Sequence, residues 1–134
     1  MNETFIINTL PVAKGRPRCT RQGRAYTPTK TRNAEEEFKT ILSTKWKHGA
    51  LENPIMLSVV FYVPMPKSWS KSKKLRMLGE PCAKRPDLDN YIKLIMDAMN
   101  GICYKDDGQV WAVTMSKQYS NTPKIEVQIM DYDY

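Results

Sequence analysis

The chain has 134 residues and a formal charge of +7 at neutral pH, from 21 basic and 14 acidic side chains. This length suits one domain, which we expect to span residues 1–134, and is too short for two. The sequence has no apolar run of membrane-spanning length, and its first residues lack the charged start and apolar core of a signal peptide. These features predict a soluble, cytoplasmic protein.

The N-terminal part is predicted to contain a strand, a hairpin and a long helix. A short apolar run at residues 4–7 fits a strand, and residues 16–26 are typical of a basic hairpin. Hydrophobic residues then recur at helical spacing to about His48. This helix has two alternative starts, with Thr27 as its cap or with Thr29 as its first residue.

The middle of the chain predicts a strand followed by a short basic helix. Residues 55–63 are β-branched and aromatic and are followed by prolines, which indicates a central strand. Either Ser68 or Ser70 can cap a helix that extends to Leu78. Residues 82–86 then form a linker into the next motif.

The clearest helix signal follows Asp87. At 100° per residue, a helix running to Asn100 has an apolar face beside a polar face that contains Asp89. Asp87 suits the N-terminal cap, and Gly101 suits a left-handed exit. The apolar face, which we expect to be buried, comprises Leu88, Ile92, Ile95, Met96 and Met99.

The C-terminal region predicts two strands, at residues 109–119 and 124–131, around a turn at 120–123. These closing strands look antiparallel. Helices and strands are mixed along the chain, so the sequence predicts an α+β fold, a mixed or antiparallel sheet packed with helices.

Positive charge is concentrated in two blocks. Residues 11–32 contain seven basic and no acidic side chains, and residues 67–85 contain seven basic and one acidic side chain. Such surfaces bind polyanions through counterion release, although a solvated surface that only aids solubility is an alternative. The side chains expected to contact DNA are Arg16, Arg18, Arg21, Arg24, Lys71, Lys73 and Lys74, with Trp69 either stacking on an exposed base or packing in the protein.

Carboxylates are clustered within this basic chain. Asp87 and Asp89 open the helix and Asp107 follows it, so a chain that turns back can return Asp107 toward the other two. Magnesium usually takes one or two protein carboxylates and keeps waters and substrate phosphate oxygens. The three aspartates are therefore predicted metal ligands. Lys93, one turn after Asp89, is placed to offset negative charge in the transition state of phosphodiester hydrolysis.

Each of these residues also has a purely structural interpretation. Asp87 can be only a helix cap, and residues 106–108 only a turn before a strand. Lys93 can form an ordinary surface ion-pair ladder with Asp89 and Asp97.

The cysteines and the histidine suggest no further chemistry. The three cysteines show no paired spacing, so neither a disulfide framework nor a zinc site is predicted. Cys103 is interpreted as a small apolar residue, and His48 as an exposed charge partner at a helix end.

Several motifs, in the same order, resemble the RusA family of Holliday junction resolvases. The central ones are RPDLDN at 85–90 with Lys93, and DAMNG at 97–101. The remaining ones are KGRPR at 14–18, YTP at 26–28, PKSWS at 66–70 and DDGQV at 106–110. The resemblance therefore covers nearly the whole chain.

The resemblance implies a homodimeric, magnesium-dependent endonuclease that cuts paired strands of a four-way DNA junction during recombination and repair, with Mn²⁺ as a possible substitute for Mg²⁺. By position, the family's metal-binding acids fall on Asp87, Asp89 and Asp107, and its catalytic lysine on Lys93. Two other functions are kept as alternatives, a metal-dependent nuclease for other branched DNA and a non-catalytic DNA-binding module.

Overall fold

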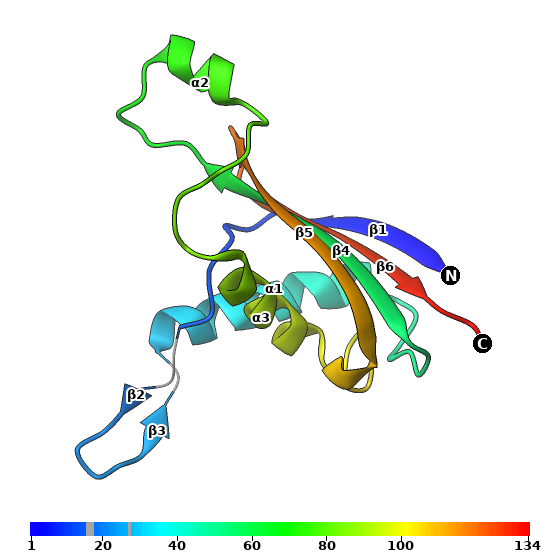
Figure 1. Ribbon diagram of the computed structural model, residues 1–134. Coiled ribbons are helices and arrows are strands. Elements are labelled where there is room, and N and C mark those ends of the chain that lie inside the picture. Colours follow the sequence, from blue (N-terminus) through cyan, green and yellow to red (C-terminus); the bar gives the residue numbers. More distant parts are fainter. Residues whose placement is uncertain (16–17, 27) are drawn as a thin grey trace.

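The computed structural model describes residues 1–15, 18–26 and 28–134 (Figure 1). Its helices and strands confirm the α+β class. In chain order they are β1 (Asn2–Ile7), β2 (Arg18–Cys19), β3 (Ala25–Tyr26), α1 (Thr29–Lys45), β4 (Ile55–Pro64), α2 (Lys71–Met77), α3 (Leu88–Met99), the 3₁₀ turn η1 (Asp107–Gln109), β5 (Val110–Ser120) and β6 (Lys124–Asp131).

The main sheet is mixed and has the strand order β1-β6-β4-β5. β6 pairs antiparallel with both β1 and β4, whereas β5 pairs parallel with β4. The two closing strands therefore run in opposite directions, as expected, but β4 lies between them. A parallel pair requires a long crossover, and here residues 65–109, which include α2 and α3, provide it.

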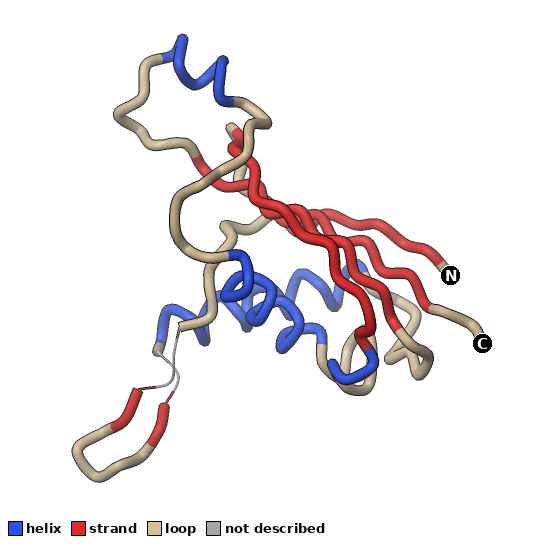
Figure 2. Tube along the Cα trace, viewed as in Figure 1, coloured by secondary structure: helices blue, strands red, loops and turns tan. Residues whose placement is uncertain are grey.

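Helices α1 and α3 cover one face of this sheet (Figure 2). Along β4 every second side chain is buried, from Ile55 to Val63, which is the period of a strand with one face against the core. Buried side chains of β6 lie on the same face, with Ile129 opposite Leu57. Phe38 of α1 contributes to the same core. This packing holds α3 in place against α1 and the sheet. It therefore also sets the position of Asp87 and Asp89 at the start of α3.

Both helix starts left open by the sequence can now be assigned. α1 begins at Thr29, and it ends at Lys45, earlier than expected, because Trp46 adopts an extended conformation and is buried. α2 begins after Ser70, whose hydroxyl accepts a hydrogen bond of 3.1 Å from the backbone N–H of Lys73. Among the described residues, no helix is both long and apolar enough to cross a membrane.

The predicted helix after Asp87 is confirmed, but its buried face is wider than expected. Asp87 occupies the cap position, and Gly101 has φ +79°, the left-handed exit. Because α3 packs against both α1 and the sheet, its buried side chains include three outside the predicted face, and two predicted members are only half-buried. The added residues are Tyr91, Leu94 and Ala98, and the half-buried ones are Leu88 and Met96.

Candidate functional site

Two carboxylates are exposed at the start of α3. Asp87 lies at the cap position, but its side chain accepts no capping hydrogen bond, and Asp89 lies in the first turn. Within the described ranges neither carboxylate takes part in a salt bridge or a side-chain hydrogen bond. The interpretation of Asp87 as only a helix cap is therefore not supported, and both groups remain available to a ligand.

The backbone around these acids is held from two sides. Lys117, on β5, donates hydrogen bonds from Nζ to the carbonyl oxygens of Lys84 at 2.5 Å and Pro86 at 2.8 Å. The backbone N–H of Lys14 donates to the carbonyl oxygen of Asn90 at 2.9 Å. The loop before Asp87 is thus attached to the sheet, and the first turn of α3 is attached to the N-terminal segment.

Lys93 forms one step of the ion-pair ladder that its spacing suggested. Its Nζ lies 3.4 Å from Oδ1 of Asp97, and its side chain is 62% exposed. Among the described contacts Lys93 makes no salt bridge with Asp89, one turn earlier. Its ammonium group is therefore accessible on the same side of the helix as Asp89.

Lys14 makes a less exposed pair of contacts. Its Nζ lies 2.9 Å from Oε1 of Glu35 on α1 and 3.1 Å from Oδ2 of Asp97 on α3. Burial by itself lowers the pKa of Lys14, but the hydrogen bonds and charges of Glu35 and Asp97 outweigh it, so the net pKa is raised. Asp97 is thereby committed to joining α3, α1 and the N-terminal segment.

Asp106 is likewise used by the fold. Its carboxylate accepts a hydrogen bond of 2.9 Å from the backbone N–H of Gly108, and its own N–H donates to Oε1 of Gln109. This is a capping box around η1, which confirms the structural interpretation for Asp106. Asp107 is half-buried and forms no salt bridge within the described part of the chain.

Asp107 lies on η1, which follows the C-terminal end of α3, whereas Asp87 and Asp89 lie at the N-terminal end of that helix. The hydroxyl of Tyr104 donates a hydrogen bond to the carbonyl oxygen of Met96, in the C-terminal half of α3. Burial, together with the charges of Asp107 and other nearby acids, raises the pKa of Tyr104, so Asp107 lies near this half of the helix. A 12-residue helix is about 18 Å long. The expectation that the chain returns Asp107 toward the other two is therefore wrong within one chain.

The three predicted metal ligands, Asp87, Asp89 and Asp107, therefore do not come together within the described residues of one chain. The described residues contain no group of three His, Cys, Asp or Glu side chains that is placed to hold a metal ion. The strand after η1 carries Lys117, rather than an acid, back to the loop before Asp87.

The predicted DNA contacts lie on two projections. Arg18, Arg21 and Arg24 belong to the β2–β3 hairpin, and Arg16 lies outside the described residues. Of the three lysines on α2, Lys71 is exposed, while Lys73 and Lys74 are half-buried. In Figure 1 the hairpin and α2 project in different directions, with the start of α3 between them.

Trp69 packs within the protein. Its ring is half-buried and meets Tyr119 edge to face, with ring centroids 5.2 Å apart. The Nζ of Lys73 lies 4.4 Å from the centroid of the same ring. These contacts favour packing over base stacking for Trp69.

The structure agrees with the interpretation of Cys103 and with the exposure of His48, but His48 lies beyond the end of α1 and contacts β1 instead of the helix end. Cys103 is fully buried, and burial raises the pKa of its thiol to about 12. His48 is exposed, and its Nε2 lies 2.6 Å from Oε2 of Glu3 on β1.

Sequence reasoning missed Lys14 and Lys117 as residues that support this site. For Lys117 a signal existed, because strand alternation places it on the same side of β5 as buried Tyr119. A lysine on the core side of a strand requires buried acceptors. For Lys14 no local pattern pointed to Asp97, which lies far along the chain.

Comparisons with known proteins identify the family of this chain. A family model described as Endodeoxyribonuclease RusA matches residues 8–130. The chain is also 37% identical over 134 residues to a Bacillus subtilis (strain 168) protein named "Uncharacterized protein YqaN", covering 95% of this chain and 94% of that relative. The match covers every motif from residue 14 to residue 110, so the chain belongs to the RusA family of endodeoxyribonucleases.

Proposed function

We propose that this protein resolves four-way DNA junctions by magnesium-dependent phosphodiester hydrolysis, in DNA recombination and repair. One observation carries the proposal beyond family membership. Asp87 and Asp89 are the uncommitted carboxylates at the start of α3, whereas the fold itself uses Asp97 and Asp106. Because these two neighbouring carboxylates have no cationic partner among the described residues, their oxygens are free to bind a metal ion.

The chemistry of Asp87 and Asp89 fits Mg²⁺. Both supply hard oxygen donors, neither has a cationic partner in the described structure, and magnesium commonly takes only one or two carboxylates. When bound, the ion would polarise the phosphoryl oxygen and activate a water, and Mn²⁺ would substitute for it. Lys93, one turn after Asp89, would place its ammonium near the charge that develops on the phosphate.

A homodimer accounts for the position of Asp107. Two symmetric copies present two equivalent sites, which suits the two strands cut in a four-way junction. A symmetric pairing of the two α3 helices would bring Asp107 of the partner subunit to Asp87 and Asp89, which is the third carboxylate that one chain does not supply.

The two basic projections give the DNA a path past these acids. Phosphates that contact the β2–β3 hairpin on one side and α2 on the other would pass the start of α3, which lies between them (Figure 1). Arg21, Arg24 and Lys71 are among the exposed cations on this path. Contacts of this kind position a duplex without reading its sequence.

The test is incubation of purified protein with a mobile four-way junction, with Mg²⁺ or with EDTA, followed by denaturing gels that map the cut on each strand. Symmetric nicks that require magnesium and that ligase can seal are expected. Equal cutting of a flap, a Y-fork and a linear duplex would instead indicate a general nuclease for branched DNA. Tight junction binding without cleavage would indicate a DNA-binding module.

A further inference from the structure

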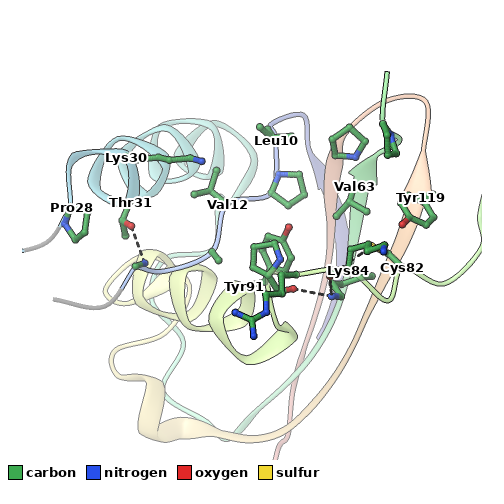
Figure 3. Close-up of a pocket in the computed structure, with 18 residues that line it drawn as sticks. Leu10, Val12, Pro28, Lys30, Thr31, Val63, Cys82, Lys84, Tyr91 and Tyr119 are labelled. Atoms are coloured by element: carbon green, nitrogen blue, oxygen red, sulfur yellow. Dashed lines mark hydrogen bonds between the residues drawn. The ribbon is translucent and has the colours of Figure 1, made fainter. Parts of the chain in front are cut away.

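An open groove of about 560 Å³ lies beside the loop that leads to Asp87 (Figure 3). Residues 82–86 form one side, and residues 10–15 with the start of α1 form the other. The ends of β4 and β5 and the first turns of α3 contribute Val63, Tyr119 and Tyr91. The volume lies in the range of about 300–1,000 Å³ that is typical of pockets for small organic groups.

The surface of the groove that faces the core is largely apolar. Tyr91 is only 5% exposed, and its ring stacks on Phe61 with centroids 5.0 Å apart and an angle of 21° between the planes. Val12 and Val63 lie near it (Figure 3). A surface of this kind accepts the face of a planar ring without rearranging.

The rim of the groove is positively charged. Four basic side chains line it, and its lining among the described residues contains no Asp or Glu. Lys30 on α1 and Lys84 on the loop are both exposed, and Figure 3 shows Val12 and Tyr91 between them. An apolar peptide would leave these cations without partners, whereas a nucleotide offers both a planar base and a phosphate.

One hydrogen-bond donor in the groove also lacks a partner. The hydroxyl of Tyr91 makes no hydrogen bond to any described residue, although its ring is buried. A phenol hydroxyl carries its proton at neutral pH, so Tyr91 can donate a hydrogen bond to a group bound in the groove.

We propose that this groove binds one unpaired nucleotide of a DNA strand, with the base on the apolar surface beside Tyr91 and the phosphate between Lys30 and Lys84. The proposal rests on the proposed function, since the strand is the one that passes Asp87. Nucleotides at the branch point of a junction lose part of their stacking, which makes them the easiest ones to turn out of a duplex.

The first experiment measures binding without cleavage. Fluorescence anisotropy in EDTA would follow a labelled single-stranded decanucleotide binding to the wild-type protein and to the double variant Lys30→Gln/Lys84→Gln. The matched control is Lys45→Gln/Lys47→Gln, which removes the same charge near the other end of α1. We expect about a tenfold higher Kd for the groove variant and about twofold or less for the control. Equal effects of the two variants would overturn the proposal.

The second experiment locates the base. An oligonucleotide containing 4-thiothymidine is photo-crosslinked to the wild-type protein in EDTA, and the linked peptides are mapped by mass spectrometry. Crosslinks at Val12 or Tyr91 are expected. Crosslinks confined to the exposed aromatic cluster of Trp111, Tyr132 and Tyr134, far from the loop before Asp87, would overturn the proposal.

The two proposals fail in different ways. If the wild-type protein cuts junctions in magnesium but the groove variant binds the decanucleotide like the control, the groove assignment is wrong and the resolvase function stands. If the wild-type protein never cuts DNA but crosslinks at Val12 or Tyr91, and the groove variant selectively loses binding, the groove assignment stands and the nuclease function is wrong.

Discussion

Lys14 and Asp97 form an ion pair of 3.1 Å that joins the segment before the basic hairpin to the helix that carries Asp89. The same ammonium group contacts Glu35, so α1 is held in the same network. A single side chain therefore couples the position of the hairpin to the position of the candidate catalytic acids.

Replacing Lys14 tests this coupling. Lys14→Met should lower the free energy of unfolding by about 1–3 kcal/mol, because two poorly exposed carboxylates lose their nearest cation and keep only the longer contacts of Asp97 with Lys93 and of Glu35 with Lys39. Lys93→Met is the matched control, since Lys93 also pairs with Asp97 but is 62% exposed, and its loss should cost about 0.5 kcal/mol or less. Urea denaturation of both variants measures the difference, and equal losses would contradict the prediction.

The stabilisation by Lys14 should also depend on pH. The pKa of Lys14 is raised in the folded protein, so its contribution is fully present below the ordinary lysine pKa of 10.5 and is lost as the pH rises through the higher folded value. The difference in Tm between the wild-type protein and Lys14→Met should therefore be constant near neutral pH and shrink as the pH rises above the ordinary lysine pKa of 10.5. A difference that stays unchanged there would rule out the charge of Lys14 as its source.

Asp89→Asn should abolish junction cleavage while junction binding in EDTA is kept or tightened. Removing a negative charge near DNA phosphates does not weaken electrostatic attraction, whereas losing a metal ligand should reduce the cleavage rate by roughly two orders of magnitude or more. Gel shift and single-turnover cleavage separate the two effects. Asp133→Asn, an exposed carboxylate near the C-terminus, serves as the control and should cleave normally.

A site shared between two subunits predicts complementation. Asp89→Asn and Asp107→Asn should each be inactive alone. After unfolding and refolding together, the mixed dimer would contain one site with both wild-type carboxylates, and nicking of one strand should return. If all three carboxylates act within one chain, every site in the mixture is defective and no nicking appears, which would refute the shared site.

The cysteines should differ sharply in reactivity. Cys103 is fully buried with a thiol pKa of about 12, so it should resist alkylation at pH 8 in the native protein, while exposed Cys19 reacts. Peptide mapping after iodoacetamide treatment, with and without urea, measures this. Rapid native labelling of Cys103 would show that the region after α3 opens.

The sequence predicted what depends on local pattern. Helical periodicity and the flanking Asp87 and Gly101 located α3 to within a residue or two, and the alternating strand at 55–63 was found for the same reason. The buried face of α3 was predicted too narrow, because Tyr91 and Leu94 are buried only by the way α1 and the sheet enclose the helix.

What the sequence did not predict depends on contacts between distant segments. The parallel pairing of β4 and β5 has no local signature, and it determines that Lys117, rather than Asp107, returns to the loop before Asp87. The groove likewise forms from five separate stretches of chain. Whether Asp87, Asp89, Lys93 and Asp107 act in catalysis stays a prediction.

The crossover between β4 and β5 also has a consequence for the order in which the chain folds. Residues 65–109 must be closed into a loop before these parallel strands can pair, and such long-range pairing is slow because loop entropy is lost before the contacts form. The lysine that holds the carbonyls of Lys84 and Pro86 arrives only with β5. The loop that leads to Asp87 and Asp89 is therefore attached to the sheet only after β5 has paired with β4.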